Sequence, residues 1–236
     1  MSASSLALGG RVFLVTGGGG AIGQPVVRAL VRAGGKVAVV ERKPDEASIA
    51  QAGALAVAAD LSTVAGAEAM VHETRSKLGR VDGLVHTIGA FAMGKVYESD
   101  LATYERMFDL NVRTLFLAIR AVMPGFLAQK SGFVCGFASL PAWTGSAPGS
   151  GLYGAAKSAV ATMLRSLDGD LTGTDIGVSI VYPMGVVDTP ANRKDMPDAD
   201  PNQWIDPEEI AQSILFAATR GPRGRITELP VSPPRA

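Results

Sequence analysis

Short runs of consecutive apolar residues alternate along this chain with longer segments in which apolar residues recur at helical spacing. Runs in which neighbouring positions are all apolar are typical of strands that are buried on both faces. They predict strands at 11–16, 36–41, 54–59, 81–87, 132–138 and 177–183, with a last short strand at 225–229. The segments between them predict helices at 21–34, 63–79, 101–128, 152–171 and 207–220.

Strands that alternate with helices favour a parallel sheet, because each return to the same edge of the sheet needs a crossover helix. Right-handed crossovers then build an α/β fold of the Rossmann type, a doubly wound parallel sheet with helices on both faces. No internal repeat or low-complexity linker interrupts 1–236, so we expect one domain. We expect the Pro- and Asp-rich stretch 195–207 to be a surface loop, and the prolines of the tail to end the last strand.

Composition narrows the class of protein. With 236 residues, of which 47% are hydrophobic and 19% charged, the chain is suited to a compact α/β domain. Lys and Arg balance Asp and Glu at 22 each, and without a basic stripe we expect no nucleic-acid partner. We find no run of about 18 apolar residues and no signal-peptide pattern at the start of the chain. We therefore expect a cytoplasmic protein without a membrane span.

The single cysteine and the two histidines carry little expected chemistry. Cys135 excludes an intrachain disulfide, and its place in a predicted buried strand favours packing over a nucleophilic role. His72 and His86 have no metal-ligand partners at a usual spacing, so we expect no metal.

The segment TGGGGAIG (16–23) follows the first predicted strand and opens the first helix. Glycine lets the backbone approach a pyrophosphate, and the start of the helix offers free N–H groups. The spacing differs from the common GxGxxG pattern, and a tight packing turn is the alternative interpretation. Its place at the first strand–helix turn favours a dinucleotide site, with candidate contacts at Gly17, Gly19, Gly20, Ala21, Ile22 and Gly23.

Glu41 ends the second strand, where a carboxylate accepts hydrogen bonds from the adenosine ribose of NAD. Arg42 and Lys43 follow at once, and a guanidinium there would suit the 2′-phosphate of NADP, although a solvated charged turn is a further alternative. We therefore expect NAD, with NADP still open. Asp60, after the third strand, is a candidate for binding the adenine or for capping the helix that begins near Thr63.

Tyr153 and Lys157 lie four residues apart, which places them on one face of a helix. A cation about 4 Å from a phenol interacts with its anion by on the order of 4 kcal/mol at an effective dielectric of 20. We therefore expect Lys157 to lower the pKa of Tyr153 toward the range of a general acid and base, although an ordinary surface pair is the alternative. Small neighbours are expected to leave this face open to a ligand, namely Gly154, Ala155, Ala156 and Ser158.

Together these motifs resemble the short-chain dehydrogenase/reductase family over nearly the whole chain. The family pattern is a TGxxx(A/G)xG turn, an asparagine in the fourth long helix, a serine after the fifth strand and YxxxK. Here they are TGGGGAIG, Asn111 of DLNVRTLF, Ser139 of FAS and YGAAK. The resemblance implies that Tyr153 donates and accepts the proton, and that Lys157 holds the nicotinamide ribose. It also implies that Ser139 polarises the substrate oxygen and that Asn111 positions a relay water.

The resemblance implies further cofactor contacts and shows some departures. The contacts would come from Leu61, Gly89, Pro183, Gly185, Val187 and Thr189, of which Gly185 and Thr189 keep the spacing of the segment that holds the carboxamide. HTIG at 86–89 stands where family members usually have NNAG, and Ala21 replaces the commoner glycine. The interval from Ser139 to Tyr153 is one residue longer than usual.

The stretch 188–200 and Trp204 resemble the dihydropteridine reductase branch, whose members generally lack the serine. Ser139 suits a carbonyl, whose developing alkoxide needs a hydrogen-bond donor. We therefore expect a small ketone or alcohol as substrate, with a quinonoid pterin as the alternative. Arg193 and Lys194 are either contacts for an acidic substrate or solvated loop charges. The side chains expected to form an apolar wall are Phe91, Met93, Pro141, Trp143 and Met184.

Two other functions would use part of the same pattern. A non-catalytic dinucleotide-binding sensor or interaction module would not need Ser139, Tyr153 and Lys157 together. A nucleotide- or methyl-donor-binding domain of another family would not bind NADH. The resemblance also implies a homodimer or homotetramer that forms through the helices at 101–128 and 152–171.

Overall fold

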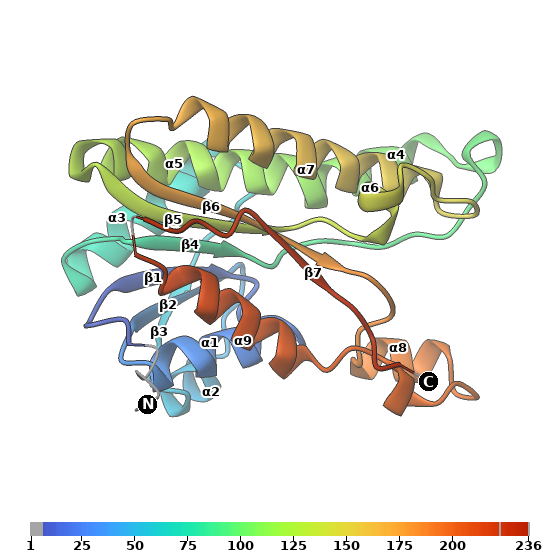
Figure 1. Cartoon of the computed structure of the whole chain (residues 1–236), viewed down its shortest axis with the longest axis horizontal. Coiled ribbons are helices and arrows are strands. Elements are labelled where there is room, and N and C mark those ends of the chain that lie inside the picture. Colours follow the sequence, from blue (N-terminus) through green and yellow to red (C-terminus); the bar gives the residue numbers. More distant parts are fainter. Residues whose placement is uncertain (1–6, 222, 236) are drawn as a thin grey trace.

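A computed structural model describes residues 7–221 and 223–235, and part of the N-terminal stretch considered above as a signal peptide, 1–6, lies outside them. These residues build a parallel sheet of seven strands in the order β3-β2-β1-β4-β5-β6-β7 (Figure 1). The strands are β1 Val12–Thr16, β2 Lys36–Glu41, β3 Leu55–Ala58, β4 Gly83–His86, β5 Ser131–Phe137, β6 Asp175–Pro183 and β7 Glu228–Val231.

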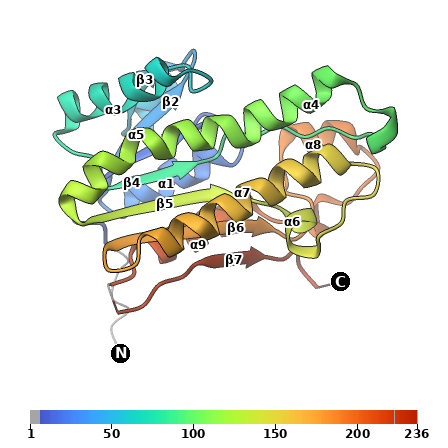
Figure 2. The ribbon, with the colours of Figure 1, turned by 90° about the horizontal axis from the view of Figure 1, so that it is seen from above.

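Helices cover both faces of the sheet (Figures 1 and 2). One face carries α1 Gly23–Arg32, α2 Glu46–Gln51 and α9 Pro207–Ala218. The other carries α3 Val64–Leu78, α5 Thr114–Gln129 and α7 Gly151–Asp170, with α4 Leu101–Phe108 leading into α5. Shorter elements are α6 Leu140–Thr144, α8 Pro190–Asp195 and the 3₁₀ turns Val96–Glu98 and Pro201–Gln203. The predicted doubly wound α/β fold is confirmed.

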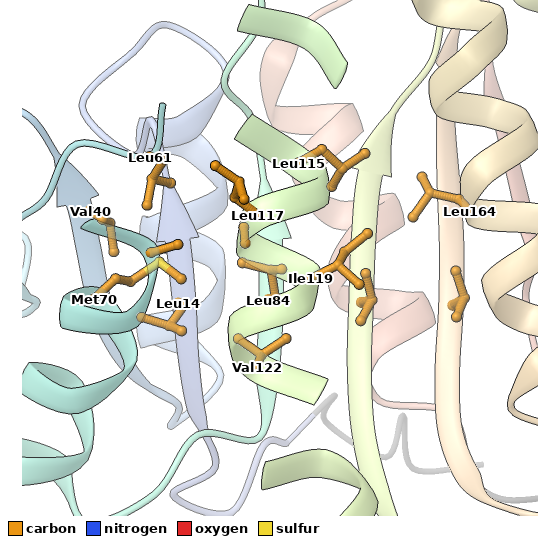
Figure 3. Packing of buried hydrophobic residues seen from close by; sticks show 14 of the residues in the cluster. Leu14, Val40, Leu61, Met70, Leu84, Leu115, Leu117, Ile119, Val122 and Leu164 are labelled. Carbon is orange, nitrogen blue, oxygen red and sulfur yellow. The ribbon is translucent and has the colours of Figure 1, made fainter. Parts of the chain in front are cut away.

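Alternation along the strands divides the core into two layers. Leu14 packs toward α3 and α5, whereas its neighbours Phe13 and Val15 pack toward α1 and α9. Figure 3 shows the first layer, where side chains of α3 and α5 close over the sheet. Burying such a side chain contributes about 1.5–3 kcal/mol, so strands that are apolar at every position are stabilised from both sides.

The order of the strands reverses at β1. The chain adds β2 and β3 on one side of β1, and β4 to β7 on the other. Thr16 at the end of β1 pairs in register with His86 at the end of β4. Open α/β sheets bind their ligands at this switch point, outside the carboxyl ends of the strands.

The helix predicted at 101–128 is interrupted. Between α4 and α5 the residues Asp109–Arg113 form a π-helical turn, in which the N–H of Thr114 donates to the carbonyl of Asp109 five residues back. By length and apolar composition alone, Leu101–Gln129 would be long enough to cross a membrane, with 44% of its most apolar window buried inside the protein. A helix that covers a sheet has the same composition, so this finding is weak support for a span.

The bounds predicted for the last strand were wrong. The last strand is Glu228–Val231 rather than 225–229, and it includes Pro230. It pairs with β6 alone and forms the edge of the sheet, where a missing N–H is tolerated. The loop predicted at 195–207 is found between α8 and α9. It contains the 3₁₀ turn Pro201–Gln203, which starts where Asp200 accepts from the N–H of Asn202, and the buried Trp204.

Candidate active site

The glycine turn is held by close backbone packing. Gly17 has a φ of 73°, which favours glycine, and its carbonyl accepts from the N–H of Gly20 at 3.0 Å. A Cβ on Gly23 would lie 2.3 Å from the Gly17 carbonyl oxygen, so a larger residue there would displace the turn. Gly19, Gly20 and Ala21 are exposed, and their backbone is accessible to a ligand at the start of α1.

Glu41 lies directly over this turn. Its carboxylate accepts from the N–H of Gly19 at 2.8 Å, and a Cβ on Gly19 would lie 2.7 Å from the same oxygen. A cavity of about 400 Å³ beside it is lined by Gly18, Lys43 and Asp45, among others. Arg42 is exposed at the next position. The structure therefore brings the Glu41 carboxylate onto the glycine turn. Arg28, which is paired with Glu208, lines the same cavity.

Asp60 does not cap the following helix, so that alternative was wrong. Thr63 caps α3 by accepting from the N–H of Gly66 at 3.0 Å. Asp60 instead accepts from the hydroxyl and the N–H of Ser62, at 2.7 and 2.9 Å, and these bonds lower the pKa of its carboxyl. Leu61 beside it is buried. Asp60 is exposed at the carboxyl edge of the sheet and retains free acceptor capacity.

Lys157 is buried one turn below Tyr153 on α7. Its ammonium lies 6.0 Å from the centroid of the Tyr153 ring and donates to the carbonyl of Phe137, at the end of β5, at 2.9 Å. Only 6% of the residue is exposed, and this burial lowers its pKa to about 8. The predicted common face of Tyr153 and Lys157 is confirmed.

The expected effect of Lys157 on Tyr153 was wrong for the protein by itself. Burial raises the pKa of the Tyr153 phenol, and the nearby Ser139 hydroxyl opposes that rise. Lys157, whose ammonium donates to the Phe137 carbonyl, does not contribute to the shift in the pKa of Tyr153. At neutral pH Tyr153 therefore carries its proton.

Ser139 has a buried hydroxyl beside the phenol. Its Oγ has no hydrogen-bond partner among residues 7–221 and 223–235, and the residue is 3% exposed. It lies close enough to Tyr153 to affect the pKa of the phenol, but without the geometry of a hydrogen bond. Buried hydroxyls are rarely left unpaired, so the position fits a donor to a substrate oxygen that also meets Tyr153.

Asn111 lies in the π-helical turn and is 1% exposed. Its side-chain nitrogen donates to the carbonyls of Met107 and Ala90, and its oxygen accepts from the N–H of Ala90 at 3.2 Å. A Cβ on Gly89 would lie 2.8 Å from this oxygen and 3.2 Å from the Lys157 ammonium nitrogen. The structure thus brings Gly89, Asn111 and Lys157 together, at the kind of helix irregularity that is frequent in functional sites.

His86 is a member of this region that the sequence analysis missed. Its ring nitrogens Nδ1 and Nε2 lie 2.8 Å from Thr16 Oγ1 and 3.1 Å from Thr114 Oγ1. Complete burial lowers its pKa to about 3, with a smaller contribution from the positive charge of Lys157. The departure of HTIG from NNAG was the available signal, since it places a histidine at a strand end beside the glycine turn.

The segment after β6 lies at the same edge of the sheet. Gly185 packs against Pro233, and a Cβ added to Gly185 would lie 3.2 Å from the Cγ of the proline ring. Val187 is buried and forms a β-bridge with Ile205. The Thr189 hydroxyl accepts from the N–H of Asn192 and caps α8. This segment therefore continues from Pro183 at the end of β6 to the start of α8 along the carboxyl edge.

An exposed ion pair lies at the end of this segment. Arg193 donates twice to the carboxylate of Asp188, at 2.6 and 2.7 Å. This pairing favours the interpretation of Arg193 as a loop charge rather than a contact for an acidic substrate.

The expected apolar wall is only partly assembled around Tyr153. The ring of Phe91 packs edge-on against Tyr153 with centroids 4.9 Å apart, and Phe91 is 55% exposed. Met93 is also exposed, whereas Trp143 packs edge-on against Tyr182 and Met184 packs against the core. Phe91 is thus the member of the wall with a ring contact to Tyr153 among the described residues.

Two of the small residues of α7 pack against neighbouring parts of the protein instead of leaving the helix face open to a ligand. A Cβ on Gly154 would lie 2.5 Å from the Cβ of Ala147, and Ala156 is fully buried, so the expectation of an open face was wrong at these two positions. Ala155 is exposed and Ser158 is half-buried.

Neither cysteine nor metal chemistry is indicated. Cys135 is buried in β5, and burial raises the pKa of its thiol, in agreement with a packing role. No group of three His, Cys, Asp or Glu side chains suited to a metal ion occurs within 7–221 and 223–235.

Known proteins are similar to this chain in sequence. The family model described as short chain dehydrogenase matches residues 11–200. An uncharacterised oxidoreductase of Staphylococcus haemolyticus is 31% identical over 231 residues, covering 96% of this chain and 98% of that protein. Two proteins of Xanthobacter autotrophicus are similar. One, 2-(S)-hydroxypropyl-CoM dehydrogenase 3, is 28% identical to this chain. The match covers 87% of this chain and 88% of that protein. The other, named inactive 2-(S)-hydroxypropyl-CoM dehydrogenase 2, is 32% identical to this chain. The match covers 81% of this chain and 90% of that protein.

The fold is also found in solved structures. The crystal structure of gox2181 superposes with a TM-score of 0.85 at 24% identity, and 98% of each chain is covered. At this identity the likeness establishes the fold.

Proposed function

This chain belongs to the short-chain dehydrogenase/reductase family, and on that premise we propose that it moves hydride between NAD(H) and a small ketone or secondary alcohol. The observation that carries the proposal is the unpaired buried hydroxyl of Ser139 next to the phenol of Tyr153. Two such hydroxyls can bind a single substrate oxygen, and Lys157 supplies a positive charge one turn below.

The protonated state of Tyr153 suits reduction of the ketone. The phenol gives its proton to the carbonyl oxygen while hydride reaches the carbonyl carbon, so that an alcohol is formed. The Ser139 hydroxyl donates a hydrogen bond to the oxygen as negative charge develops on it. The nicotinamide, when bound, supplies or accepts the hydride. Proton uptake from solvent returns Tyr153 to its starting state, and the reverse sequence oxidises the alcohol.

Lys157 and Asn111 support this proton transfer without binding the substrate oxygen themselves. The Lys157 ammonium is held by the Phe137 carbonyl at a depth where its positive charge lowers the pKa of the buried His86 ring. Its pKa near 8 leaves it largely charged at neutral pH. Asn111 fixes the backbone at Ala90, so that Gly89 lies against the ammonium, where a side chain would collide.

The residues of the glycine turn fit NAD better than NADP. The carboxylate of Glu41 already binds the N–H of Gly19, where the adenosine ribose would lie in a dinucleotide site. Ribose hydroxyls donate to a carboxylate, whereas a 2′-phosphate would be repelled by it. The free Arg42 side chain is exposed beside it and is the residue that an NADP-binding variant would use.

The substrate class rests on Ser139 and on a relative. A hydroxypropyl group with its hydroxyl at carbon 2 is a secondary alcohol, and a relative named for its dehydrogenation is 28% identical to this chain. A protein named inactive is 32% identical, so turnover has to be measured rather than assumed. A non-catalytic dinucleotide-binding protein is the outcome if no turnover is found.

The experiment is a substrate panel with the purified protein. Small aliphatic ketones, aryl ketones and a quinonoid dihydropterin are each mixed with NADH or NADPH, and the loss of absorbance of the reduced nicotinamide is followed. Turnover of a ketone with NADH supports the proposal. Saturable NADH binding without turnover of any ketone contradicts it and favours a sensor, and turnover of the pterin alone favours the pterin reductase alternative.

We also propose that the protein assembles with a second copy through α4, α5 and α7. Leu101, Tyr104, Phe116 and Leu127 on α4 and α5 are 45–69% exposed, and soluble monomers rarely expose many large apolar side chains along one element. Light scattering should give at least twice the mass of 24.4 kDa. A monomer at micromolar concentration would contradict this.

A further inference from the structure

We propose that His86 is a positioning residue, which through Thr114 holds the π-helical turn Asp109–Arg113 and keeps Asn111 in contact with the backbone beside Lys157. The inference rests on the proposed function for its catalytic consequence. Its structural content stands on the contacts of three buried side chains, Thr16, His86 and Thr114, which are each at most 3% exposed.

The first contact joins the two strands at the switch point. Thr16 and His86 are partners in the register of β1 and β4, so their side chains project to the same face of the sheet. That face is the one covered by α5, which begins at Thr114. Each strand then continues at once into a segment of the site, the glycine turn after Thr16 and the loop to Gly89 after His86.

The second contact arises from the geometry of the π-helical turn. In a regular α-helix the N–H of Thr114 would donate to the carbonyl of Leu110 four residues back. Here it donates to the carbonyl of Asp109 instead. The Leu110 carbonyl accepts from the hydroxyl of Thr114, at 2.8 Å. The Thr114 side chain therefore replaces the backbone bond that the turn has lost.

This bond assigns the direction of the remaining hydrogen bonds. Thr114 Oγ1 has one hydrogen, which it gives to Leu110, so it must accept from His86 at Nε2. A neutral imidazole with its hydrogen on Nε2 has an acceptor at Nδ1, which receives the hydrogen of Thr16 Oγ1. One chain of bonds thus runs Thr16 to His86 to Thr114 to Leu110. Only a neutral ring completes it, and burial keeps the pKa of His86 far below neutral pH.

Asn111 follows Leu110 in the turn and depends on its shape. Its amide makes three hydrogen bonds, two of them to the backbone of Ala90. Ala90 follows Gly89, which lies against the ammonium of Lys157. If Thr114 lost its hydroxyl, the Leu110 carbonyl and the Nε2 of His86 would each lose the hydrogen bond to Thr114 in a buried site. We therefore expect the turn to rearrange.

The test compares nearly isosteric variants of the full-length protein. Thr114→Val removes the hydroxyl and Thr114→Ser retains it. Thr74→Val is the matched control, because Thr74 is fully buried on α3 and its hydroxyl has no hydrogen-bond partner within the part of the chain that the structure describes. The measurement is NMR hydrogen exchange of the Ala90 amide, whose N–H is bonded to Asn111 and which needs neither cofactor nor turnover.

We expect the Ala90 amide hydrogen to exchange at least tenfold faster in Thr114→Val than in Thr74→Val. In Thr114→Ser it should exchange at the wild-type rate. His86→Leu should add little to the effect of Thr114→Val, since the two act through one bond. An unchanged Ala90 exchange rate in Thr114→Val, with global stability like that of Thr74→Val, would overturn the proposal. So would the same increase in Thr114→Ser.

Activity is the second readout, with the ketone found in the substrate panel. We expect Thr114→Val to lower kcat with little change in the Kd for NADH, and Thr114→Ser to restore kcat. If the wild-type protein turned over no ketone while the Ala90 amide still responded as expected, the proposed function would fail and the positioning role of His86 would stand.

Discussion

The ammonium of Lys157 donates to the carbonyl of Phe137 at 2.9 Å, while the phenol of Tyr153 lies one helical turn above it on α7. The carbonyl belongs to the last residue of β5, two residues before Ser139. One backbone segment thus places both the charge and the hydroxyl that Tyr153 needs. Since burial raises the pKa of the Tyr153 phenol, Tyr153 begins as an acid.

The raised pKa of Tyr153 predicts different pH dependences for the two directions of reaction. Oxidation needs the phenolate, so kcat/KM for the alcohol should rise about tenfold per pH unit between pH 6 and 7.5, where Lys157 with its pKa of about 8 keeps most of its charge. Reduction needs the phenol and should be nearly flat over the same range. Initial rates with the best alcohol and ketone pair provide the measurement. Equal rates of oxidation at pH 6 and pH 7.5 would contradict the role of Tyr153 as the base.

The carboxylate of Glu41 predicts the choice of cofactor. Glu41→Ser removes the negative charge over Gly19, so NADPH should bind at least tenfold more tightly to the variant than to the wild type. The Kd values for NADH and NADPH follow from quenching of tryptophan fluorescence. Wild-type protein that binds the two nucleotides equally would show that Glu41 does not select between them.

The close approach of Gly23 to Gly17 predicts that alanine is not tolerated in the turn. Gly23→Ala places a methyl group against the Gly17 carbonyl, and we expect a loss of stability of about 1–3 kcal/mol together with at least tenfold weaker NADH binding. Gly169→Ala is the control, because a Cβ there meets nothing within 4 Å on the exposed side of α7. It should gain up to about 1 kcal/mol in urea unfolding and bind NADH normally. Similar behaviour of both variants would refute the packing argument.

The burial of His86 predicts acid sensitivity. Its pKa is about 3 in the folded protein, below the ordinary value of 6.5, so its contribution to stability is complete above pH 6.5 and is lost as pH falls toward 3. Between pH 6.5 and 5 the free energy of unfolding should fall by about 1.4 kcal/mol per pH unit. His86→Gln should abolish this slope, whereas His72→Gln, at an exposed position of α3, should keep it. A wild-type slope near zero in urea titrations would show that His86 is not buried as described.

Much of the fold was predictable because it depends on local patterns. Runs such as VFLVT are apolar at every position, which requires a sheet covered on both faces, and α3 begins at the threonine that caps it. The shorter helices α2 and α6 were not predicted, since each has at most six residues and leaves little periodicity to read. The π-helical turn was missed for a different reason. It is stabilised by the side chains of Thr114 and His86, which lie 28 positions apart.

The site was predictable where residue type and spacing determine geometry, as for Tyr153 and Lys157 on one helical face. The pKa of Tyr153 was not, because it depends on how deeply the folded chain buries the phenol and on the nearby Ser139 hydroxyl. His86 was set aside for lacking metal-ligand partners, while its actual partners are two threonine hydroxyls distant in sequence.

Turnover by Tyr153→Phe, measured beside its NADH affinity, is the most direct test of the acid and base role of Tyr153. The variant keeps the ring and its edge-on contact with Phe91 and loses only the hydroxyl. We expect kcat for ketone reduction to fall by at least a factor of about 100, with the Kd for NADH within twofold of the wild type. A variant that binds NADH normally and reduces the ketone at the wild-type rate would contradict the account.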